Sequence, residues 1–348
     1  MRKILKFYCA VLALGMLLAA ICACKKTDHP PDDAESAAEQ SDGGGQENGD
    51  GGNPSGEEAP REEMPEDNGY FVSEKSIDAT LISFNMEMVY NETERAEAVA
   101  AFLLKEAPSV VCLQEVWQNY VSVLQEGLTD RYAVLYKSLQ SGTAEGLVIA
   151  YDKTQWSLVE ENRFWLSETP DVKSKGWDSL SYAICYNVVL EHIETGVRLS
   201  VFNAKLDETS ETARVGGMKL ITAEISKSAY PVFFGCDLNA VNTSEAYATV
   251  TAELADCQNT ERTDTGATYH RDRTVTGGVS TDFCFVSGES VKTDSFSICR
   301  DKYGEAGELF LSDHYAVKAE VRIIYKVTGR PNTTENGFDG VIDAVGQS

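Results

Sequence analysis

Polar side chains with catalytic chemistry recur at the ends of apolar segments in this 348-residue chain. They are Asn85 closing LISFN, Glu115 closing VVCLQE, Asp237 and Asn239 closing VFFGCDLN, and Asp313 with His314 opening the last apolar run in LSDHYAV. Each one alone has an ordinary explanation, because Asn and Asp also cap helices and form turns. Together they offer carboxylates, amides and an imidazole. That set is typical of metal-assisted hydrolysis.

The segment RLSVFNAKLDE, residues 198–208, adds a cation to this pattern. Side chains alternate across a strand, so Asn203, Lys205 and Asp207 share one face of the predicted strand. A solvated surface would explain three polar residues on one face. Strand ends in α/β proteins are also where sites are built, so the segment stays a candidate for the site.

The elements that must position these residues alternate in type along the chain. Apolar runs over 79–85, 109–116, 231–238 and 281–287 predict buried strands, and a hairpin is expected over 182–206 with its turn at 194–196. Helices are expected over 92–107, 117–128, 210–228 and 243–254, with Gly216 and Gly217 weakening the third. The pattern predicts one α/β domain over residues 70–326, followed by a polar C-terminal tail over 327–348.

The N-terminus predicts export. Arg2, Lys3 and Lys6 precede an apolar run from Phe7 to Ala20, which is shorter than the roughly 20 residues of a membrane span. The following ICAC is similar to the lipobox of bacterial lipoproteins, which implies a signal peptide over 1–23 and lipid attachment at Cys24. The resemblance places the protein at the extracytoplasmic face of a bacterial cell membrane. A plain signal peptide or an uncleaved anchor is the alternative.

Residues 24–69 form the predicted tether. From residue 27 to 69 the chain has 14 acidic residues and one arginine among many Gly, Pro and Ser. Such a segment buries too little apolar surface to offset its chain entropy, so we expect a disordered, self-repelling linker. The remainder of the chain has 24 basic and 41 acidic residues. This balance argues against a nonspecific grip on nucleic acid, but not against divalent cations.

Cysteine positions favour thiols over a disulfide framework. Three of the nine cysteines lie in the leader. Cys112, Cys185, Cys236 and Cys284 all lie inside apolar runs that are predicted strands. Buried free thiols are therefore expected, although export would also permit disulfides.

The ordered motifs SFN, LQE, CDLNA, STDFCFVS and LSDHYAV resemble those of the endonuclease/exonuclease/phosphatase superfamily, which contains DNase I-like metal-dependent phosphoesterases. The resemblance covers about residues 78–323, and RFWLSETPDVKSKGWDS is similar to a branch of bacterial hydrolases. It implies an α/β, four-layer α/β/β/α sandwich of two mixed β-sheets flanked by helices. A site would lie at one rim of the sandwich.

The resemblance also implies a role for each matching residue. Glu115 would be the principal ligand of Mg²⁺, or of Mn²⁺, with Asn85 beside it and Asp313 near the ion. Asp237 and Asn239 would position and deprotonate the attacking water, and His314 would stabilise or protonate the phosphoryl oxygens. Glu145 would orient His314, and Asp282 would be a second orienting carboxylate.

Three positions depart from the family pattern. Lys205 stands where close relatives have a histidine that contacts the phosphate, Ala183 where they have arginine, and Cys236 where they have glycine. A lysine could still attract a phosphoryl group and pair with Asp282. Because its ordinary pKa is about 10.4, it would be a poor proton donor unless burial lowers that pKa.

Two functions remain open from the sequence. The first is a lipid-anchored, Mg²⁺-dependent phosphoesterase that uses activated water on a phosphate mono- or diester. A small molecule or a lipid head group is favoured as substrate, nucleic acid is the alternative, and no protein partner is inferred. The second is a catalytically impaired relative that binds a phosphate compound at the surface. The loop residue His270 is a weaker candidate for a replacement group near the rim.

Overall fold

The computed structural model describes residues 71–87, 93–139, 145–270, 278–329 and 340–344. The predicted signal peptide over 1–23 and the predicted tether over 24–69, with Cys24, lie outside these residues. Among the described residues, no helix combines the length and the apolar character that crossing a membrane requires.

The first of two large sheets contains the N-terminal strand and the long C-terminal strand as neighbours. Its strands lie in the order β11 (Val291–Cys299), β14 (Ala316–Gly329), β1 (Phe71–Asn85), β2 (Val110–Trp117), β4 (Glu145–Asp152) and β3 (Tyr132–Ser138). A further strand, β15 (Gly340–Ala344), pairs with β14. Only β1 and β2 run parallel in this sheet, so it is mixed.

The second sheet is built from the middle of the chain. Its order is β5 (Trp156–Trp165), β6 (Ile184–His192), β7 (Arg198–Lys205), β8 (Val232–Asp237), β10 (Asp282–Val286) and β9 (Ala255–Asp256). Its parallel pair is β7 with β8, and all its other pairs are antiparallel. The expected hairpin is confirmed as β6 and β7.

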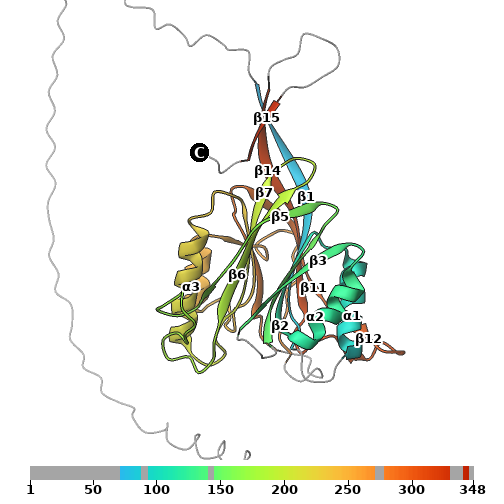
Figure 1. The fold of residues 1–348 in the computed structure, drawn as a ribbon, viewed down its shortest axis with the longest axis vertical. Helices are drawn as coiled ribbons and strands as arrows, with labels where there is room; N and C mark the ends of the chain where they lie inside the picture. The colour runs from blue at the N-terminus through green and yellow to red at the C-terminus, as the bar shows by residue number, and fades with distance from the viewer. Residues whose placement is uncertain (1–70, 88–92, 140–144, 271–277, 330–339, 345–348) are drawn as a thin grey trace, which may run out of the picture. The chain divides into compact units, whose positions relative to one another are not determined.

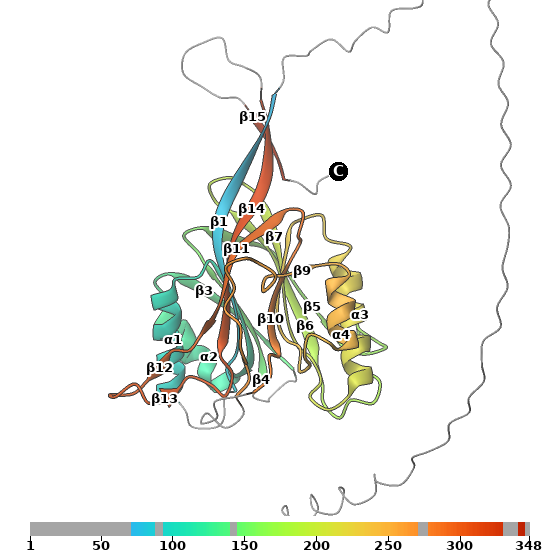
Figure 2. The ribbon, with the colours of Figure 1, turned by 180° about the vertical axis from the view of Figure 1, so that it is seen from behind.

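Helices cover the outer face of each sheet (Figures 1 and 2). The helices α1 (Thr93–Glu106) and α2 (Gln118–Leu128) pack on the first sheet, and α3 (Glu211–Ile225) and α4 (Glu245–Thr251) pack on the second. Side chains such as Leu81, Cys112 and Phe233 fill the space between the sheets. The predicted four-layer α/β/β/α sandwich is confirmed. A small hairpin of β12 (Lys302–Tyr303) and β13 (Leu309–Phe310) lies outside the two sheets.

The C-terminal end of the domain differs from the sequence interpretation. The apolar pattern predicts a domain end at Lys326, but β14 continues to Gly329 and β15 pairs with it in the register Gly329↔Gly340. β1 also begins earlier than expected, and Phe71 pairs with Gly329. Polar residues therefore continue these strands as a ribbon, because backbone pairing needs no apolar face.

The cysteine prediction is confirmed for the residues that the structure describes. Cys112, Cys185, Cys236, Cys257 and Cys284 are buried free thiols, and Cys299 is free and half-buried. Burial raises the pKa of Cys257 and Cys299 to about 12. These thiols are therefore packing residues, not nucleophiles.

Candidate active site at the rim of the two sheets

An irregularity in β2 places Glu115 at the site. The register between β2 and β4 shifts between Leu113 and Val116, and Glu115 lies in this bulge with a left-handed φ of 52°. A bulge of this kind redirects a side chain out of the regular alternation of a strand. Asn239, which follows β8, has a similar φ of 49°. Two predicted site residues therefore adopt a backbone conformation that is uncommon for residues other than glycine.

The Asn85 amide connects two of the predicted site carboxylates. Its Nδ2 donates to Glu115 Oε1 and to Asp237 Oδ2, both at 2.9 Å, while its Oδ1 accepts the backbone N–H of Glu87 at 2.9 Å. Asn85 was predicted as a metal ligand. In this orientation its Nδ2 faces the two carboxylates and its Oδ1 faces the Glu87 N–H, and the role as a metal ligand stays a prediction. Asp237 also accepts the backbone N–H of Asn239 at 3.0 Å.

Lys205, at the end of β7, lies among carboxylates. Its Nζ is 2.7 Å from Glu115 Oε1 and 2.5 Å from Glu208 Oε1. The predicted ion pair with Asp282 is wrong. Asp282 lies in β10, which pairs with β8, so β8 separates it from β7. Lys205 instead crosses toward the bulge of β2 in the other sheet.

His314 is held by Asp282. The Nδ1 of His314 is 2.9 Å from Asp282 Oδ2 and 3.1 Å from Oδ1, and both side chains are buried. The carboxylate that orients His314 is therefore Asp282. Glu145, predicted for this role, lies at the start of β4 beside Lys205, on the wall of a neighbouring pocket. Asp313 has its Oδ1 3.7 Å from His314 Nε2, so it lies at the same site.

Three further residues of the site were missed by the sequence analysis. Thr268 donates to Asp282 Oδ2 at 2.6 Å, Tyr269 packs its ring on His314 with centroids 4.6 Å apart, and Glu208 pairs with Lys205. Thr268 and Tyr269 lie in the segment TYH that led to the proposal of His270. The His270 ring instead packs between Phe310 and Tyr315. No pattern in the sequence indicates that Tyr269, and not His270, lies at the site.

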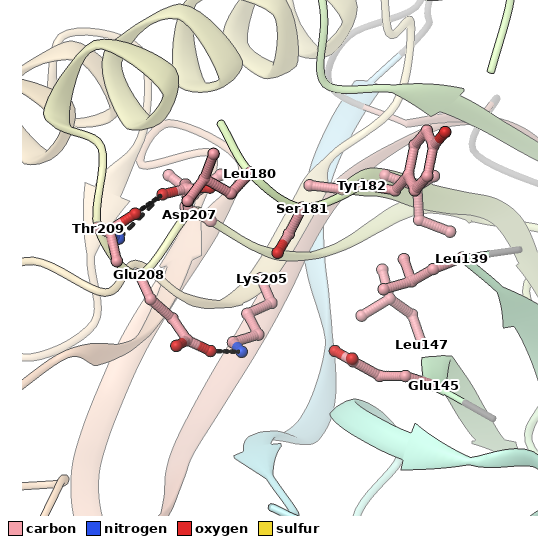
Figure 3. A pocket seen from close by; sticks show the side chains of 13 residues that line it. Leu139, Glu145, Leu147, Leu180, Ser181, Tyr182, Lys205, Asp207, Glu208 and Thr209 are labelled. Carbon is pink, nitrogen blue, oxygen red and sulfur yellow. Dashed lines mark hydrogen bonds and ion pairs between the residues drawn. The ribbon is translucent and has the colours of Figure 1, made fainter. Parts of the chain in front are cut away.

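A pocket of about 270 Å³ opens beside Lys205 (Figure 3). Glu208 and Glu145 approach the lysine from opposite sides, and Leu139, Leu147 and Tyr182 form a more apolar wall. Ala183 also lines this pocket, at the position where the family resemblance implies an arginine. The small side chain of Ala183 leaves space there. Lys205 is the positively charged residue among those that line the pocket.

The protonation states of the site residues depend on burial and on the neighbouring charges. Burial raises the pKa of Asp237 to about 6, with a further contribution from Asp282. Burial acts to lower the pKa of His314, but Asp282, Asp237 and Asp313 outweigh it and raise that pKa to about 10. Burial likewise acts to raise the pKa of Glu115, but Lys205 outweighs it and the pKa is lowered. Asp237 is therefore mostly ionised at neutral pH, and His314 is protonated.

Lys205 keeps its charge as well. Burial acts to lower its pKa, but Glu115, Asp237, Glu145 and Glu208 together outweigh burial and raise it. The condition under which Lys205 could donate a proton near neutral pH, a pKa lowered by burial, is therefore not met. Its contribution at this position is a fixed positive charge.

The donor set fits a hard divalent cation. Six carboxylates gather here, from Glu115, Glu145, Glu208, Asp237, Asp282 and Asp313, against the cationic side chains of Lys205 and His314. Buried carboxylates in excess over cations need further positive charge, and carboxylate oxygens are the ligands that Mg²⁺ and Mn²⁺ prefer. Carboxylate oxygens of Asp237 and Asp282 also lie within 4.8 Å of each other.

Comparison with known proteins identifies the family. Residues 82–314 match the sequence profile of the endonuclease/exonuclease/phosphatase family. The chain belongs to this family. No curated protein matches the sequence.

Solved structures agree with the assignment to the endonuclease/exonuclease/phosphatase family. A Bacteroides vulgatus member is 26% identical, and the match covers 71% of this chain and 99% of that one, with a TM-score of 0.64. A mannosyl-6-phosphatase of Bacteroides thetaiotaomicron is 25% identical over 70% of this chain and 99% of that one, with the same TM-score of 0.64. D. rerio TDP2 in complex with a single-stranded DNA product is 18% identical over 70% and 98%, with a TM-score of 0.57, and shows the fold alone. Members of the family are hydrolases that act on phosphoesters.

Proposed function

We propose that this protein hydrolyses a phosphate ester with activated water in a reaction that depends on a divalent cation. The observation that carries the proposal is the buried pair of Asp237, hydrogen-bonded to Asn85, and His314, held by Asp282. A carboxylate with a pKa of about 6 is ionised at neutral pH and suits a base that orients and deprotonates water. A protonated imidazole suits the phosphoryl oxygens.

Other residues of the chain support the same reaction. Asn239 is fixed by two hydrogen bonds, from its backbone N–H to Asp237 Oδ1 and from its Nδ2 to Leu206 O. It thereby holds Asp237 in one orientation. Lys205 supplies a fixed positive charge beside the pocket that would receive the ester. Glu115 and Asp313 would hold the cation, which when bound supplies charge stabilisation to the phosphate.

The favoured substrate is a small phosphate ester or a lipid head group. The formal net charge of −25 opposes long nucleic acids, which require a basic surface. A pocket of about 270 Å³ suits a compact group. The similarity to a mannosyl-6-phosphatase, at 25% identity, supports a phosphomonoester of a hydroxylated small molecule. Nucleic acid remains the alternative substrate.

The location is part of the proposal. The leader sequence supports lipid attachment at Cys24, with the domain on the extracytoplasmic face of a bacterial membrane. The acidic residues between Cys24 and residue 70 would separate the domain from the membrane surface. The mass of the N-terminal peptide from the native host checks the attachment. An unmodified peptide that begins elsewhere than at Cys24 would contradict it.

Hydrolysis by the full chain tests the proposal. A panel of sugar phosphates, lipid head-group esters and oligonucleotides with Mg²⁺ or Mn²⁺ should contain at least one substrate, and Glu115→Gln should lower its turnover by about 10³-fold. The matched control is Glu191→Gln, because Glu191 pairs with Arg198 at the other end of β6 and β7. A folded chain that hydrolyses nothing in the panel would refute the proposed reaction.

A second function is favoured by the Lys205–Glu115 contact and by Ala183. If the ammonium remains on Glu115, the chain would bind a phosphate compound without turnover. Equilibrium dialysis with the same panel would then detect binding without product, and Lys205→His would create no activity. Turnover by the wild-type chain that depends on Asp237 would exclude this function.

A further inference from the structure

The Glu115 carboxylate already has a cation beside it. Its Oε1 lies 2.7 Å from the Lys205 ammonium and accepts a hydrogen bond from Asn85 Nδ2 at 2.9 Å. Two donors therefore converge on one oxygen. The ammonium lies beside this one carboxylate, and it opposes a divalent cation on either of its oxygens because like charges a few ångströms apart repel strongly in a partly buried site.

Lys205 also has a second carboxylate to which it can remain bound. Glu208 Oε1 is 2.5 Å from the same Nζ, and Glu208 is three residues further along the chain. Glu145 faces the lysine across the pocket (Figure 3). Movement of the ammonium away from Glu115 would therefore not leave it unpaired. A lysine side chain has several rotatable bonds, so the ammonium can leave Glu115 while it stays beside Glu208.

We propose that Lys205 competes with the divalent cation for Glu115, so that the cation binds only when the ammonium releases Glu115 and stays on Glu208. The inference rests on the proposed function in one respect, because it requires that a divalent cation can bind at Glu115. In the structure the ammonium contacts both carboxylates and lines the pocket where the phosphate would bind. With Glu115 retained it excludes the cation, and on Glu208 alone it leaves Glu115 to the cation.

The competition predicts that the wild-type chain binds the cation weakly. Substitution of Lys205 by an uncharged residue should increase the affinity. Lys205→Met removes the charge and keeps an unbranched side chain, so Mn²⁺ should bind at least about tenfold more tightly. Lys205→Arg keeps the charge and should not show this gain. Lys219→Met removes the same charge from the surface pair with Glu245 and should leave Mn²⁺ affinity within about twofold of wild type.

Electron paramagnetic resonance of free Mn²⁺, titrated against each full-length chain, measures these affinities without an activity assay. Glu115→Gln should abolish the binding in both the wild-type and the Lys205→Met background. A Lys205→Met chain that binds Mn²⁺ no more tightly than wild type would overturn the competition. Hydrolysis of the substrate panel is measured separately, so a failed competition is distinguishable from a failed phosphoesterase.

A second measurement uses the wild-type chain alone and so does not depend on the folding of a variant. Saturating Mn²⁺ should release Lys205 from Glu115 and raise its rate of acetylation, followed by mass spectrometry, at least about twofold. Lys318, which pairs with Glu106 on the outer side of the first sheet, is the internal reference. An unchanged ratio of Lys205 to Lys318 labelling at saturating Mn²⁺ would also overturn the inference.

Discussion

Glu115 and Asn239 both have an uncommon left-handed backbone conformation that contacts within the site stabilise. Both have φ near 50°, where glycine would be less strained; the Glu115 side chain accepts from Asn85 of the site, and the Asn239 backbone N–H donates to Asp237. Such conformations cost about 1 kcal/mol or more each, and they persist where neighbouring contacts hold them. The contacts of Glu115 and Asn239 with other site residues therefore hold an uncommon backbone conformation at both positions.

Asp282 should matter more for turnover than for folding. It neutralises and orients the His314 imidazole, so Asp282→Asn should lower kcat by about 10²–10³-fold through loss of charge and alignment. The substrate found in the panel measures this effect. Asp256→Asn is the matched control, because Asp256 is a buried aspartate of β9 that accepts from Tyr247 and pairs with Phe285, at the end of β10 away from Asp282. An equal loss of kcat in both folded variants would contradict a role for Asp282 at His314.

The sequence predicted which residues meet at the site better than it predicted their partners. Polar residues at strand ends come together because the sheet topology brings those ends to one rim. The partner of Lys205 depended on the bulge at Glu115, which follows from backbone pairing and has no signature in LQE. The orientation of the Asn85 amide likewise depended on the Glu87 N–H, which the strand pattern does not include.

Element boundaries followed the apolar pattern only where an apolar face is needed. The strands and helices of the core were predicted because their burial imposes a period on the sequence. The ribbon of β1, β14 and β15 extends beyond that core, and its backbone pairing tolerates polar residues such as Ser73 and Glu74. The polar composition there predicted only a tail and no strand, since pairing between distant segments is not visible in local composition.

The two glycines of α3 have different structural reasons. The helix begins at the cap Ser210, whose Oγ accepts the N–H of Ala213, and it continues without a break through Gly216 and Gly217. A Cβ on Gly216 would lie 2.2 Å from ring atoms of Trp177, whereas a Cβ on Gly217 would make ordinary contacts with Leu166 at 3.5 Å. Close packing of the Trp177 loop therefore requires the first glycine and not the second.

Alanine at the two positions should shift the free energy of unfolding in opposite directions. Gly216→Ala should lower it by about 1–3 kcal/mol, because the Trp177 ring must move. Gly217→Ala should raise it by about 0.5–1 kcal/mol, because alanine favours the helix. Urea unfolding measures both, and tryptophan fluorescence should change only in the first variant. Equal effects of the two substitutions would show that Trp177 does not pack on α3 in solution.

At the scale of the whole molecule, one side chain links the two sheets behind the site. Asn203 of β7 is fully buried and donates from Nδ2 to Leu113 O at 2.9 Å and to Val148 O at 2.8 Å, both in the opposite sheet. Its Oδ1 accepts from Gln114 Nε2 at 2.9 Å. Leu113 and Val148 are paired where the register shifts to form the Glu115 bulge, so Asn203 satisfies backbone groups at that bulge.

Loss of this link should therefore weaken the fold and the cation site together. Asn203→Leu keeps the size but leaves two carbonyls and an amide without these partners, so the free energy of unfolding should fall by about 2–5 kcal/mol. Mn²⁺ affinity should also fall in the protein that remains folded, because Glu115 loses its fixed backbone. Asn187→Leu on the adjacent strand is the control, since among the described residues Asn187 Oδ1 has no hydrogen-bond partner. A stability loss without any change in Mn²⁺ affinity would show that Asn203 joins the sheets but does not position Glu115.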